Sequence, residues 1–524
     1  MKLFLVGAGP WSPGLLTLRG AEVLGRADVV FFDHLANPEL IELHCRSDVE
    51  RVFVGKRSNR AVMSQEEIQA AMVAAARAGR TVVRLKGGDP FLFGRGGEEG
   101  EALSAAGLAF EVVPGVTSAL AGPAFAGIPM TDRRSASSVA IVTGHQRQGG
   151  DRVDLGALGQ AADTVVFLMG VLQLRENLQA MVDGGLDPAT PAAVIRWATR
   201  ADQQTVVGTA GDLADLAEAE GLRPPAVVVV GHVVARRKAL AWFEKRPLFG
   251  RTVVVTRPSR SLSSGAAADS LVVALTEQGA TVMRVPAIAL RAPEDSAPLK
   301  TAVAQLDHYD WLVLTSRNAV ERFASALEEA GLDSRAMAGL RVACVGPATV
   351  RRAWELLRVR ADLVPEASYR GAALADALID QGIAGRRLLH PRASAASEEL
   401  AESLREAGAE VDDPVAYETV SGDTDPTELL AALRAGQVDA VTFASGSAVD
   451  GLVEMVGINA LREVTLAAIG PVTVDALACH GLTAEVVPDR STASGLVDAL
   501  VDRFRVEHPT EQQPGTAASP GDTV

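Results

Sequence analysis

Hydrophobic and polar positions along this chain form two kinds of stretch that alternate. Short apolar runs rich in valine, leucine and phenylalanine predict buried strands, and stretches with helical spacing, such as Gln65 to Ala76, lie between them. This order predicts an α/β fold, in which helices cover a sheet. The strands predicted for the first half are Leu3 to Val6, Asp28 to Phe32, Thr81 to Leu85 and Phe110 to Val113, and then Ser138 to Val142, Thr164 to Leu168, Ala192 to Ile195 and Ala226 to Val230.

The pattern starts again near residue 251. The segment Pro247-Leu248-Phe249-Gly250 has the composition of a linker, so we expect a linker over 246–250. A new apolar run, Thr252 to Val255, then ends in a polar turn, much as the chain begins. Because 524 residues also exceed what one hydrophobic core usually serves, we expect two fused proteins with several lobes.

The second half contains an internal repeat. Residues 310–320 match residues 439–449, and each copy runs from an aspartate through apolar residues to a serine, Ser316 or Ser445. Residues 345–349 and 469–473 match in the same order, each with a Gly-Pro step before a threonine, Thr349 or Thr473. Two similar α/β lobes are therefore expected.

Composition and charge exclude several classes of protein. The apolar runs are too short for a transmembrane helix or a signal peptide, and the net charge of -15 opposes binding to nucleic acid or to an anionic membrane. Three widely separated cysteines predict neither a disulfide framework nor a zinc site, and they fit a reducing cytoplasm. From about Val506 the polar composition predicts a disordered tail, residues 506–524.

Two motifs in the first half indicate a ligand site. Gly7-Ala8-Gly9-Pro10 follows the first predicted strand, where glycines let backbone N–H groups approach a ligand. A dinucleotide fingerprint would need a further glycine at Ser12, so we do not expect a nicotinamide cofactor. The block from Arg84 to Glu99, with its Gly-Gly-Asp turn after a strand, is much more specific.

On these motifs, residues 1–245 resemble the uroporphyrinogen-III C-methyltransferases of the tetrapyrrole methylase family, with lobes over about 1–114 and 115–245. The resemblance implies a homodimer formed through this half, and two lobes that enclose S-adenosylmethionine, without a metal. Further motifs that carry it are Asp33-His-Leu, Val54-Gly-Lys-Arg57, Pro114-Gly-Val-Thr-Ser118, Gly127-Ile-Pro129, Val142-Thr-Gly-His145 and Phe167-Leu-Met-Gly170. The cofactor contacts that it implies are Pro10, Gly87, Gly88, Asp89, Leu92, Thr117, Ser118, Met169 and Ala198.

The resemblance also assigns the reacting groups. Asp33 ends an apolar run and takes the family's proton-acceptor position, and Lys56 takes the proton-donor position. Arg57 and Arg60 could hold substrate carboxylates. For the basic residues a solvated surface charge is an equal alternative, and Met169 could be a core residue.

Three positions depart from the family pattern. Trp11-Ser12 stands where the family usually has Gly-Asp, Asp132 where it has His, and Ala198 where it has Gly. These departures bear on substrate preference and rate.

Residues 251–505 resemble uroporphyrinogen-III synthase through Thr315-Ser316, Gly346-Pro347, Pro391-Arg392, Tyr417 and the repeated motifs. The resemblance implies two lobes, one over about 251–286 plus 420–505 and the other over about 287–419. Ser316, Thr349, Ser445 and Thr473 could bind substrate carboxylates; alternatively they are only helix caps. Tyr417 is the candidate acid for hydroxyl loss, or else a buried structural residue.

Together the halves predict a bifunctional enzyme of tetrapyrrole biosynthesis. It would cyclise hydroxymethylbilane to uroporphyrinogen III with ring inversion and then add two methyl groups to give precorrin-2, on the siroheme or cobalamin branch. The expected partners are polyanionic tetrapyrroles. Three alternatives remain: a second half that only senses tetrapyrroles, a later corrinoid as methyl acceptor, and a nucleic-acid methyltransferase, which the acidic balance opposes.

Overall fold

The computed structural model describes residues 2–57, 60–61, 63–145, 153–256, 270–366, 370–422 and 424–507. Contacts divide the chain into two compact units. The first contains Met1–Arg251 and Val273–Thr281, and the second contains Thr252–Val272 and Val282–Glu507. The predicted disordered tail lies almost wholly outside the described residues, although the last helix continues to Glu507.

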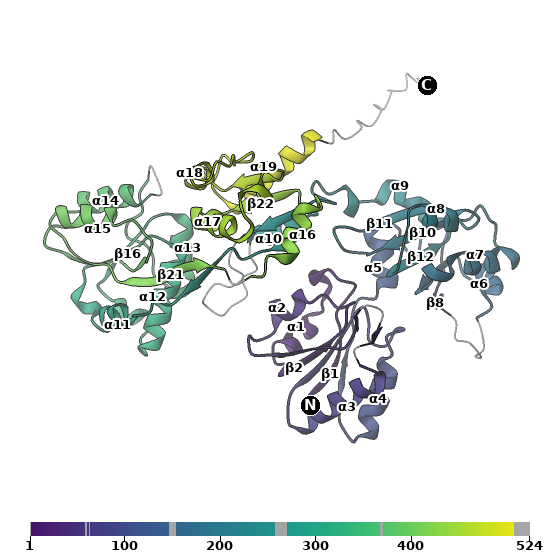
Figure 1. Cartoon of the computed structure of the whole chain (residues 1–524). Coiled ribbons are helices and arrows are strands. Elements are labelled where there is room, and N and C mark those ends of the chain that lie inside the picture. The colour runs from purple at the N-terminus through teal and green to yellow at the C-terminus, as the bar shows by residue number, and fades with distance from the viewer. Residues whose placement is uncertain are drawn as a thin grey trace, which may run out of the picture. The chain divides into compact units, whose positions relative to one another are not determined.

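The first lobe of the first unit is built on a parallel sheet in the order β3-β2-β6-β1-β7. Alternate residues of each strand face opposite ways, so Phe4 and Val6 pack on one side with α1 and α2, while Leu3 and Leu5 pack on the other with α3 and α4 (Figure 1). Its elements are β1 (Leu3–Gly7), α1 (Leu18–Leu24), β2 (Val29–Phe32), α2 (Glu39–His44), β3 (Glu50–Phe53), β4 (Lys56–Arg57), β5 (Arg60–Ala61), α3 (Gln65–Arg77), β6 (Val82–Lys86), α4 (Gly96–Ala105) and β7 (Glu111–Val113).

The second lobe has a mixed sheet in the order β11-β10-β12-β9-β8, in which only the β8–β9 pair is parallel. The predicted strands of both lobes are confirmed, and their ends differ by one residue or none. The elements are α5 (Ser118–Phe125), β8 (Val139–Thr143), α6 (Leu155–Ala161), β9 (Thr164–Leu168), α7 (Leu174–Asp183), β10 (Pro191–Arg196), β11 (Gln204–Thr209), α8 (Leu213–Ala219), β12 (Ala226–Val230) and α9 (Arg237–Leu240).

One sheet of the second unit has the order β14-β13-β22-β23 and therefore takes strands from both ends of the unit. The predicted linker over 246–250 is a turn whose Leu248 is fully buried. Elements of this part are β13 (Thr252–Val255), β14 (Thr281–Arg284), α16 (Thr427–Arg434), β22 (Ala440–Phe443), α17 (Gly446–Val456), β23 (Thr465–Ala468), α18 (Pro471–Cys479) and α19 (Ala493–Glu507). Between β13 and β14 lies α10 (Ser270–Glu277), whose residues from Val273 onwards belong to the first unit.

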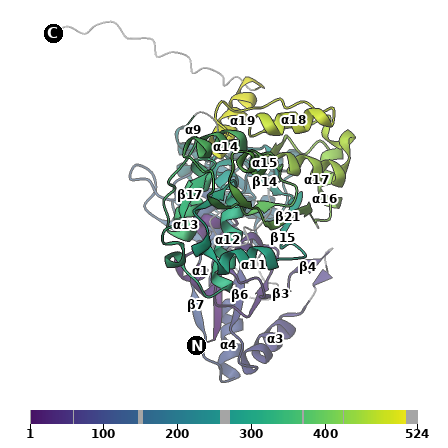
Figure 2. The same ribbon diagram turned by 90° about the vertical axis from the view of Figure 1, so that its left-hand side faces the viewer.

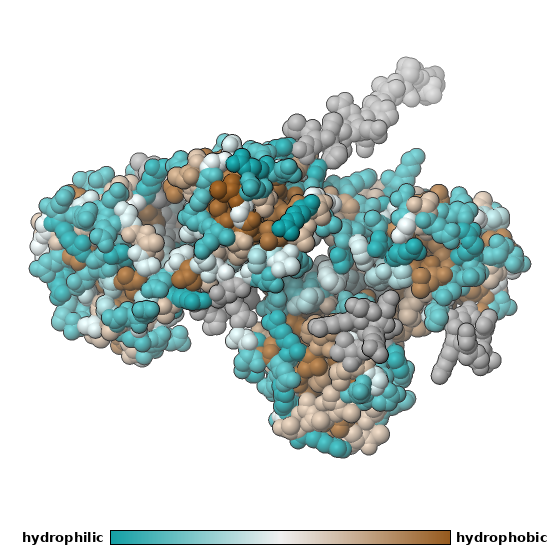
Figure 3. Space-filling model, viewed as in Figure 1, coloured by the Kyte–Doolittle hydropathy of each residue, from teal (hydrophilic) through white to brown (hydrophobic). Residues whose placement is uncertain are grey.

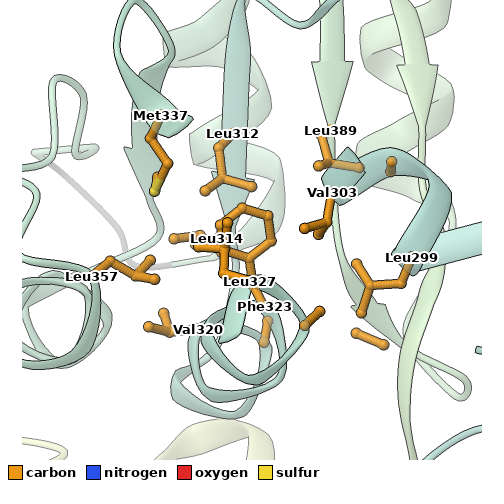
Figure 4. Packing of buried hydrophobic residues seen from close by; sticks show 14 of the residues in the cluster. Leu299, Val303, Leu312, Leu314, Val320, Phe323, Leu327, Met337, Leu357 and Leu389 are labelled. Atoms are coloured by element: carbon orange, nitrogen blue, oxygen red, sulfur yellow. The ribbon is translucent and has the colours of Figure 1, made fainter. Parts of the chain in front are cut away.

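The other large sheet of this unit has the order β17-β16-β18-β20 (Figures 1 and 2), with α14 and α15 on one side and α11, α12 and α13 on the other. Figure 4 shows Phe323 and Leu327 of α12 directed at Leu312 and Leu314 of β16. Its elements are α11 (Ala297–Ala304), β16 (Trp311–Leu314), α12 (Arg317–Glu329), β17 (Arg341–Cys344), α13 (Pro347–Leu357), α14 (Gly371–Asp380), β18 (Arg387–Leu389), α15 (Glu399–Glu406) and β20 (Glu410–Asp412).

The internal repeat is confirmed at the level of elements. In each copy a strand leads into a serine-capped helix, β16 to α12 and β22 to α17, and the next strand leads through Gly-Pro into α13 or α18. Even the bridge at the end of the motif recurs, as Ala343 with Leu363 and Ala467 with Val486.

A small third sheet, β15-β21-β19, connects these two parts of the second unit. Its strands are β15 (Ile288–Arg291), β19 (Arg392–Ala393) and β21 (Val415–Ser421), with β15 antiparallel to β21. Leu290 and Tyr417 pack into the core around α12, whereas Ala287, just before β15, packs with α17. The chain therefore passes between the two parts twice, once along β15 and once along β21.

The face seen in Figure 3 is mostly hydrophilic, with several hydrophobic areas among the polar ones. No helix in the part of the chain described above is long and apolar enough to cross a membrane.

Candidate active sites

A cluster of four charged side chains lies at the carboxyl end of β2 and β6. Arg84 Nη2 donates to Asp33 Oδ2 at 3.0 Å, and its Nε lies 3.3 Å from Glu99 Oε1. Lys86 Nζ donates to the same Glu99 oxygen at 2.9 Å. The side chain of Asp33 is 21% exposed and that of Glu99 is 0% exposed, so the cluster reaches the surface at Asp33.

Local structure explains how the cluster forms. Arg84 and Lys86 are two residues apart on β6, which directs both side chains to one face of the sheet. On that face lies the first turn of α4, which carries Glu99. Burial and the nearby Arg84 lower the pKa of Lys86, and the Glu99 carboxylate partly offsets this. Each cation here therefore depends on a buried carboxylate.

Arg84, Lys86 and Glu99 belong to a sequence motif, but the sequence predicted no role for them. A signal was available, because two charges alternate within the strand Val82-Val83-Arg84-Leu85-Lys86, whose five residues are all buried. Buried charges in a central strand require partners, and this requirement could have identified the cluster.

Three glycine-containing turns meet at the ends of β1, β6 and β7. A Cβ added to Gly7 would lie 2.5 Å from the Gly115 Cα and 2.7 Å from the Gly88 oxygen, so only glycine permits this approach. Gly9 and Gly88 exchange backbone hydrogen bonds of 3.2 and 2.8 Å. The predicted cofactor residues Gly87 and Gly88 therefore lie beside the turn that begins at Gly7.

The carboxylate of Asp89 fixes these turns to one another. It accepts hydrogen bonds from the N–H groups of Phe91 at 2.8 Å, Leu92 at 3.1 Å and Gly115 at 3.0 Å. Asp89 is expected from the resemblance to contact the cofactor, and the structure adds this role in shaping the loop. Thr117 caps the following helix, α5, by accepting from the Ala119 N–H.

The second lobe contributes Ala198 and Met169. A Cβ added to Gly122 of α5 would lie 3.4 Å from the Ala198 Cβ, which brings Ala198 close to the helix that begins with Ser118. Met169 follows β9 with a φ of 54° and is 55% exposed, so it is not the core residue considered as the alternative. Among the described residues, Met169 takes no part in the hydrogen bonds and close approaches given above for the glycine turns, Asp89 and Ala198.

Lys56 and Arg57 form β4, which pairs with β5, where Arg60 lies; their side chains are outside the described residues. Their backbone is nevertheless located. Val54 N–H donates to the Phe32 oxygen at 2.9 Å, and a Cβ on Gly55 would lie 3.2 Å from the His34 nitrogen. The segment that carries Lys56 therefore starts beside the turn that carries Asp33.

In the second unit, the side chains of Tyr417 and Ser316 are hydrogen-bonded to each other. The Tyr417 hydroxyl lies 3.1 Å from Ser316 Oγ, and Tyr417 is only 6% exposed. Beside them, His390 Nε2 lies 3.2 Å from Thr315 Oγ1. Burial lowers the pKa of His390 to about 4, with a smaller opposing effect from Asp413. No role for His390 was predicted from the sequence.

The other predicted substrate residues occupy matching places in the repeat. Ser316 and Ser445 cap α12 and α17 by accepting from Ala319 and Ala448, so the helix-cap alternative describes a contact that both serines make. Thr349 and Thr473 lie in the first turns of α13 and α18 and are 4% and 3% exposed. Among the described residues, no hydrogen bond links Ser316 or Tyr417 to Ser445.

A metal centre is a further possibility for such polar clusters. Over the ranges of the chain that are described, no group of three or more His, Cys, Asp or Glu side chains is arranged to hold a metal ion.

Sequence comparison separates the same two halves. The family described as Tetrapyrrole (Corrin/Porphyrin) Methylases matches residues 2–214, and the family described as Uroporphyrinogen-III synthase HemD matches residues 269–498. The porphyrin biosynthesis protein HemD of Ruminiclostridium josui is 35% identical over 499 residues, which are 95% of this chain and 97% of that protein.

Two further similarities concern the first half. The siroheme synthase of Chromobacterium violaceum is 48% identical over 243 residues, which are 46% of this chain and 52% of that protein, so this chain matches about half of it. A crystal structure of uroporphyrin-III C-methyl transferase from Thermus thermophilus, complexed with S-adenyl homocysteine, is 38% identical, covers 45% of this chain and 99% of that one, and has a TM-score of 0.38.

The fold and the matches define an α/β enzyme of tetrapyrrole biosynthesis with a methyltransferase half and a synthase half. The chain belongs to the family of proteins that fuse a uroporphyrinogen-III C-methyltransferase to a uroporphyrinogen-III synthase.

Proposed function

We propose that this enzyme closes hydroxymethylbilane to uroporphyrinogen III, with inversion of one pyrrole ring, and methylates that product twice to give precorrin-2. The observation that carries the proposal is the position of Asp33. A carboxylate held by Arg84 at 3.0 Å lies at the carboxyl edge of a parallel sheet, beside a cradle of three glycine turns. That edge is where open α/β sheets bind ligands.

The methyl donor is S-adenosyl-L-methionine. Support for its site comes from the close approach of the turns at Gly7, Gly88 and Gly115, which side chains at Gly7 or Gly115 would prevent, and from the backbone groups that these turns present. We assign donor contacts to Pro10, Gly87, Gly88, Asp89, Leu92, Thr117, Ser118, Met169 and Ala198. The donor supplies an electrophilic methyl group, and the protein has to align it with a pyrrole carbon.

Methylation leaves a cationic macrocycle that must lose a proton. We assign the acceptor role to Asp33, because Arg84 and the Leu35 N–H each engage one of its oxygens and leave further lone pairs available. Lys56 is assigned as proton donor and Arg57 as a carboxylate ligand of the substrate, since their backbone begins beside the Asp33 turn.

For the synthase half, we assign Tyr417 as the acid that assists loss of the bilane hydroxyl. Its own hydroxyl is held by Ser316, and a phenol can donate without carrying charge at neutral pH. Ser316, Thr349, Ser445 and Thr473 are the proposed carboxylate ligands, supported by their matching places at the helix N-termini of the repeat.

The experiment supplies the purified chain with hydroxymethylbilane, with and without S-adenosylmethionine. The products are identified by mass spectrometry and isomer-resolved chromatography. The III isomer alone, with two methyl groups gained when the donor is present, is the expected result. If added uroporphyrinogen III is methylated but hydroxymethylbilane yields only the I isomer, the second half is a sensing module rather than a synthase.

Variants assign the two reactions to their sites. Asp33→Asn should abolish methylation while the III isomer still forms, and Tyr417→Phe should slow formation of the III isomer while added uroporphyrinogen III is still methylated. Loss of both reactions in either variant would contradict the assignment.

The proposal also includes the domain limits, the oligomeric state, the pathway branch and the cellular compartment. We divide the chain at 246–250 into a methyltransferase of residues 1–245 and a synthase of residues 251–505, with lobes as given above. The methyltransferase half would form the homodimer, and the product would enter the siroheme or the cobalamin branch. Three cysteines without a disulfide fit a reducing cytoplasm.

A further inference from the structure

A stack of two tryptophans and an arginine joins the two lobes of the methyltransferase half. The guanidinium carbon of Arg200 lies 4.7 Å from the ring centre of Trp11 and 4.7 Å from that of Trp197. Trp11 follows β1 in the first lobe, whereas Trp197 and Arg200 follow β10 in the second. Cation–π contact of this kind attracts the guanidinium to both rings.

Two nitrogens of the Arg200 guanidinium pair with a carboxylate of the same lobe. Its Nε and Nη2 donate to the two carboxylate oxygens of Asp202 at 2.8 and 2.9 Å. Because the planar edge of the guanidinium is paired in this way and its carbon faces two rings, Arg200 serves to hold the lobes rather than to bind a substrate carboxylate.

A second contact between the lobes lies next to the stack. The Thr199 hydroxyl donates to the Pro10 oxygen at 3.0 Å and accepts from the Ser12 N–H at 3.1 Å. Thr199 is 5% exposed, and its own N–H donates to the buried Gln203 side chain at 3.0 Å. Thr199 therefore connects the backbone on both sides of Trp11 to the second lobe.

The backbone of Trp11 has a conformation that is unusual for a residue with a large side chain. Its φ is 118°, in a region that favours glycine and is unfavourable for a residue with a large side chain. The resembling family usually has glycine there. A tryptophan persists in this conformation only if the surrounding contacts compensate for the strain, and the contact with Arg200 is available to do so.

We infer that Trp11, Thr199 and Arg200 form an inter-lobe clasp, and that Trp11 is a positioning residue for binding of the methyl donor. The inference rests on the proposed function, in which Pro10 and Ala198 contact the donor. Pro10 immediately precedes Trp11, and Ala198 lies between Trp197 and Thr199. The clasp thus holds the donor contacts of the two lobes at a fixed separation before the donor arrives, which reduces the ordering cost of binding.

The test is titration of S-adenosylhomocysteine into the full chain by calorimetry, for wild type, Trp11→Gly and Trp11→Phe. Glycine removes the ring and the backbone strain together, so the melting temperature should not fall. The Kd should rise about tenfold, the size that a cation–π contact can supply, whereas phenylalanine should restore most of the affinity. The KM for S-adenosylmethionine should follow the Kd, while kcat at saturating donor changes about twofold or less.

Arg200→Met and Arg175→Met provide a matched pair that leaves Trp11 intact. Both arginines pair with exposed acidic residues in the second lobe, but only Arg200 contacts two rings. Arg200→Met should weaken S-adenosylhomocysteine binding like Trp11→Gly, and Arg175→Met should not. Wild-type affinity in Trp11→Gly or in Arg200→Met would overturn the inference, and so would an equal loss in Arg175→Met. Failure of the wild-type chain itself to bind would instead overturn the proposed donor site.

Discussion

Glu99 is a carboxylate without exposed surface, and three side chains donate to one of its oxygens. Lys86, Arg84 and Gln65 lie 2.9, 3.3 and 3.1 Å from Glu99 Oε1. Two of these partners are cations that are themselves buried, and Asp33 lies on the far side of Arg84. At the scale of single residues, the stability of the first lobe and the placing of Asp33 depend on the same charges.

Glu99→Gln should therefore destabilise the first unit by about 3 kcal/mol, because it leaves two buried cations with a single carboxylate. Urea unfolding followed by fluorescence measures the loss. Glu98→Gln is the matched control: the neighbouring carboxylate pairs with Arg95 at the surface, where such a pair contributes about 1 kcal/mol or less. Equal effects of the two changes would show that Glu99 is not the carboxylate that matches the buried cations.

His390 should make the stability of the second unit depend on pH. Burial lowers its pKa to about 4 in the folded protein, against 6.5 for an ordinary histidine, so between these values the unfolded state binds more protons. The stabilisation is fully present above pH 6.5 and is lost as the pH falls towards 4, by about 2 kcal/mol between pH 7.5 and 5.

The measurement is urea unfolding of wild type and His390→Gln across that pH range. Glutamine can still reach Thr315 but does not titrate, so its curve should be flatter by the stated amount. Arg392 and Arg405 also disfavour the charged imidazole, and Asp413 favours it. Parallel curves for the two proteins would assign the pH dependence to other groups.

At the scale of elements, some glycines allow the backbone of a neighbouring turn to pack against them, and others have open space where a side chain would lie. A Cβ on Gly115 would lie 2.2 Å from the Gly88 oxygen and 2.7 Å from the Gly7 Cα. At Gly97, in the first turn of α4, nothing lies within 4 Å. Both glycines belong to motifs of the sequence. The sequence alone cannot show that only Gly115 is required by the close approach of another turn.

Gly115→Ala should push the turn after β7 away from the turns after β1 and β6, reduce S-adenosylhomocysteine affinity more than tenfold and lower the melting temperature of the first unit. Gly97→Ala should raise stability by roughly 0.5 to 1 kcal/mol, the helix propensity of alanine over glycine. Calorimetry and thermal melting of both proteins give the comparison. The opposite signs are the prediction, and a shared sign would contradict it.

The two serine caps allow a comparison within the repeat. Ser316→Ala and Ser445→Ala should each cost about 1 kcal/mol, because each removes an acceptor at a helix N-terminus. Ser316→Ala should cost about 1 kcal/mol more, since it also removes the partner of the Tyr417 hydroxyl. Chemical unfolding of the second unit measures both, and equal losses would mean that the contact with Tyr417 contributes nothing to stability.

The strands predicted for the first half were located to within about one residue, because most of those apolar runs coincide with buried strands; β3 and β11, whose residues are exposed or half-buried, were not predicted. The ends were less certain: Phe110 was expected in a strand that begins at Glu111. Strand limits depend on hydrogen bonds to neighbouring strands, such as the pairing of Phe4 with Glu111, and these partners are distant in sequence.

At the scale of the whole molecule, the chain consists of two units that serve consecutive reactions of the proposed function. Tethering them raises the local concentration of the product of one near the other without requiring a channel. Each unit has its own cores, so each should unfold in its own transition.

S-adenosylhomocysteine at about 100 times its Kd should stabilise the first unit by about 2.7 kcal/mol and leave the second unchanged. Differential scanning calorimetry with and without the ligand follows both transitions, and His390→Gln identifies which belongs to the second unit. A shift of both transitions together would mean that the units unfold cooperatively rather than separately.

The α/β class, the two halves, the internal repeat and the motifs that identify the family could all be derived from the amino-acid sequence. All of these are carried by local periodicity and by residues close together in the chain. Tertiary structure decided which charges pair and which turns touch: Arg84 with Asp33, Ser316 with Tyr417, and Thr199 with Pro10 across 189 positions. Such contacts depend on how distant strands are ordered in a sheet, and no local pattern contains that order.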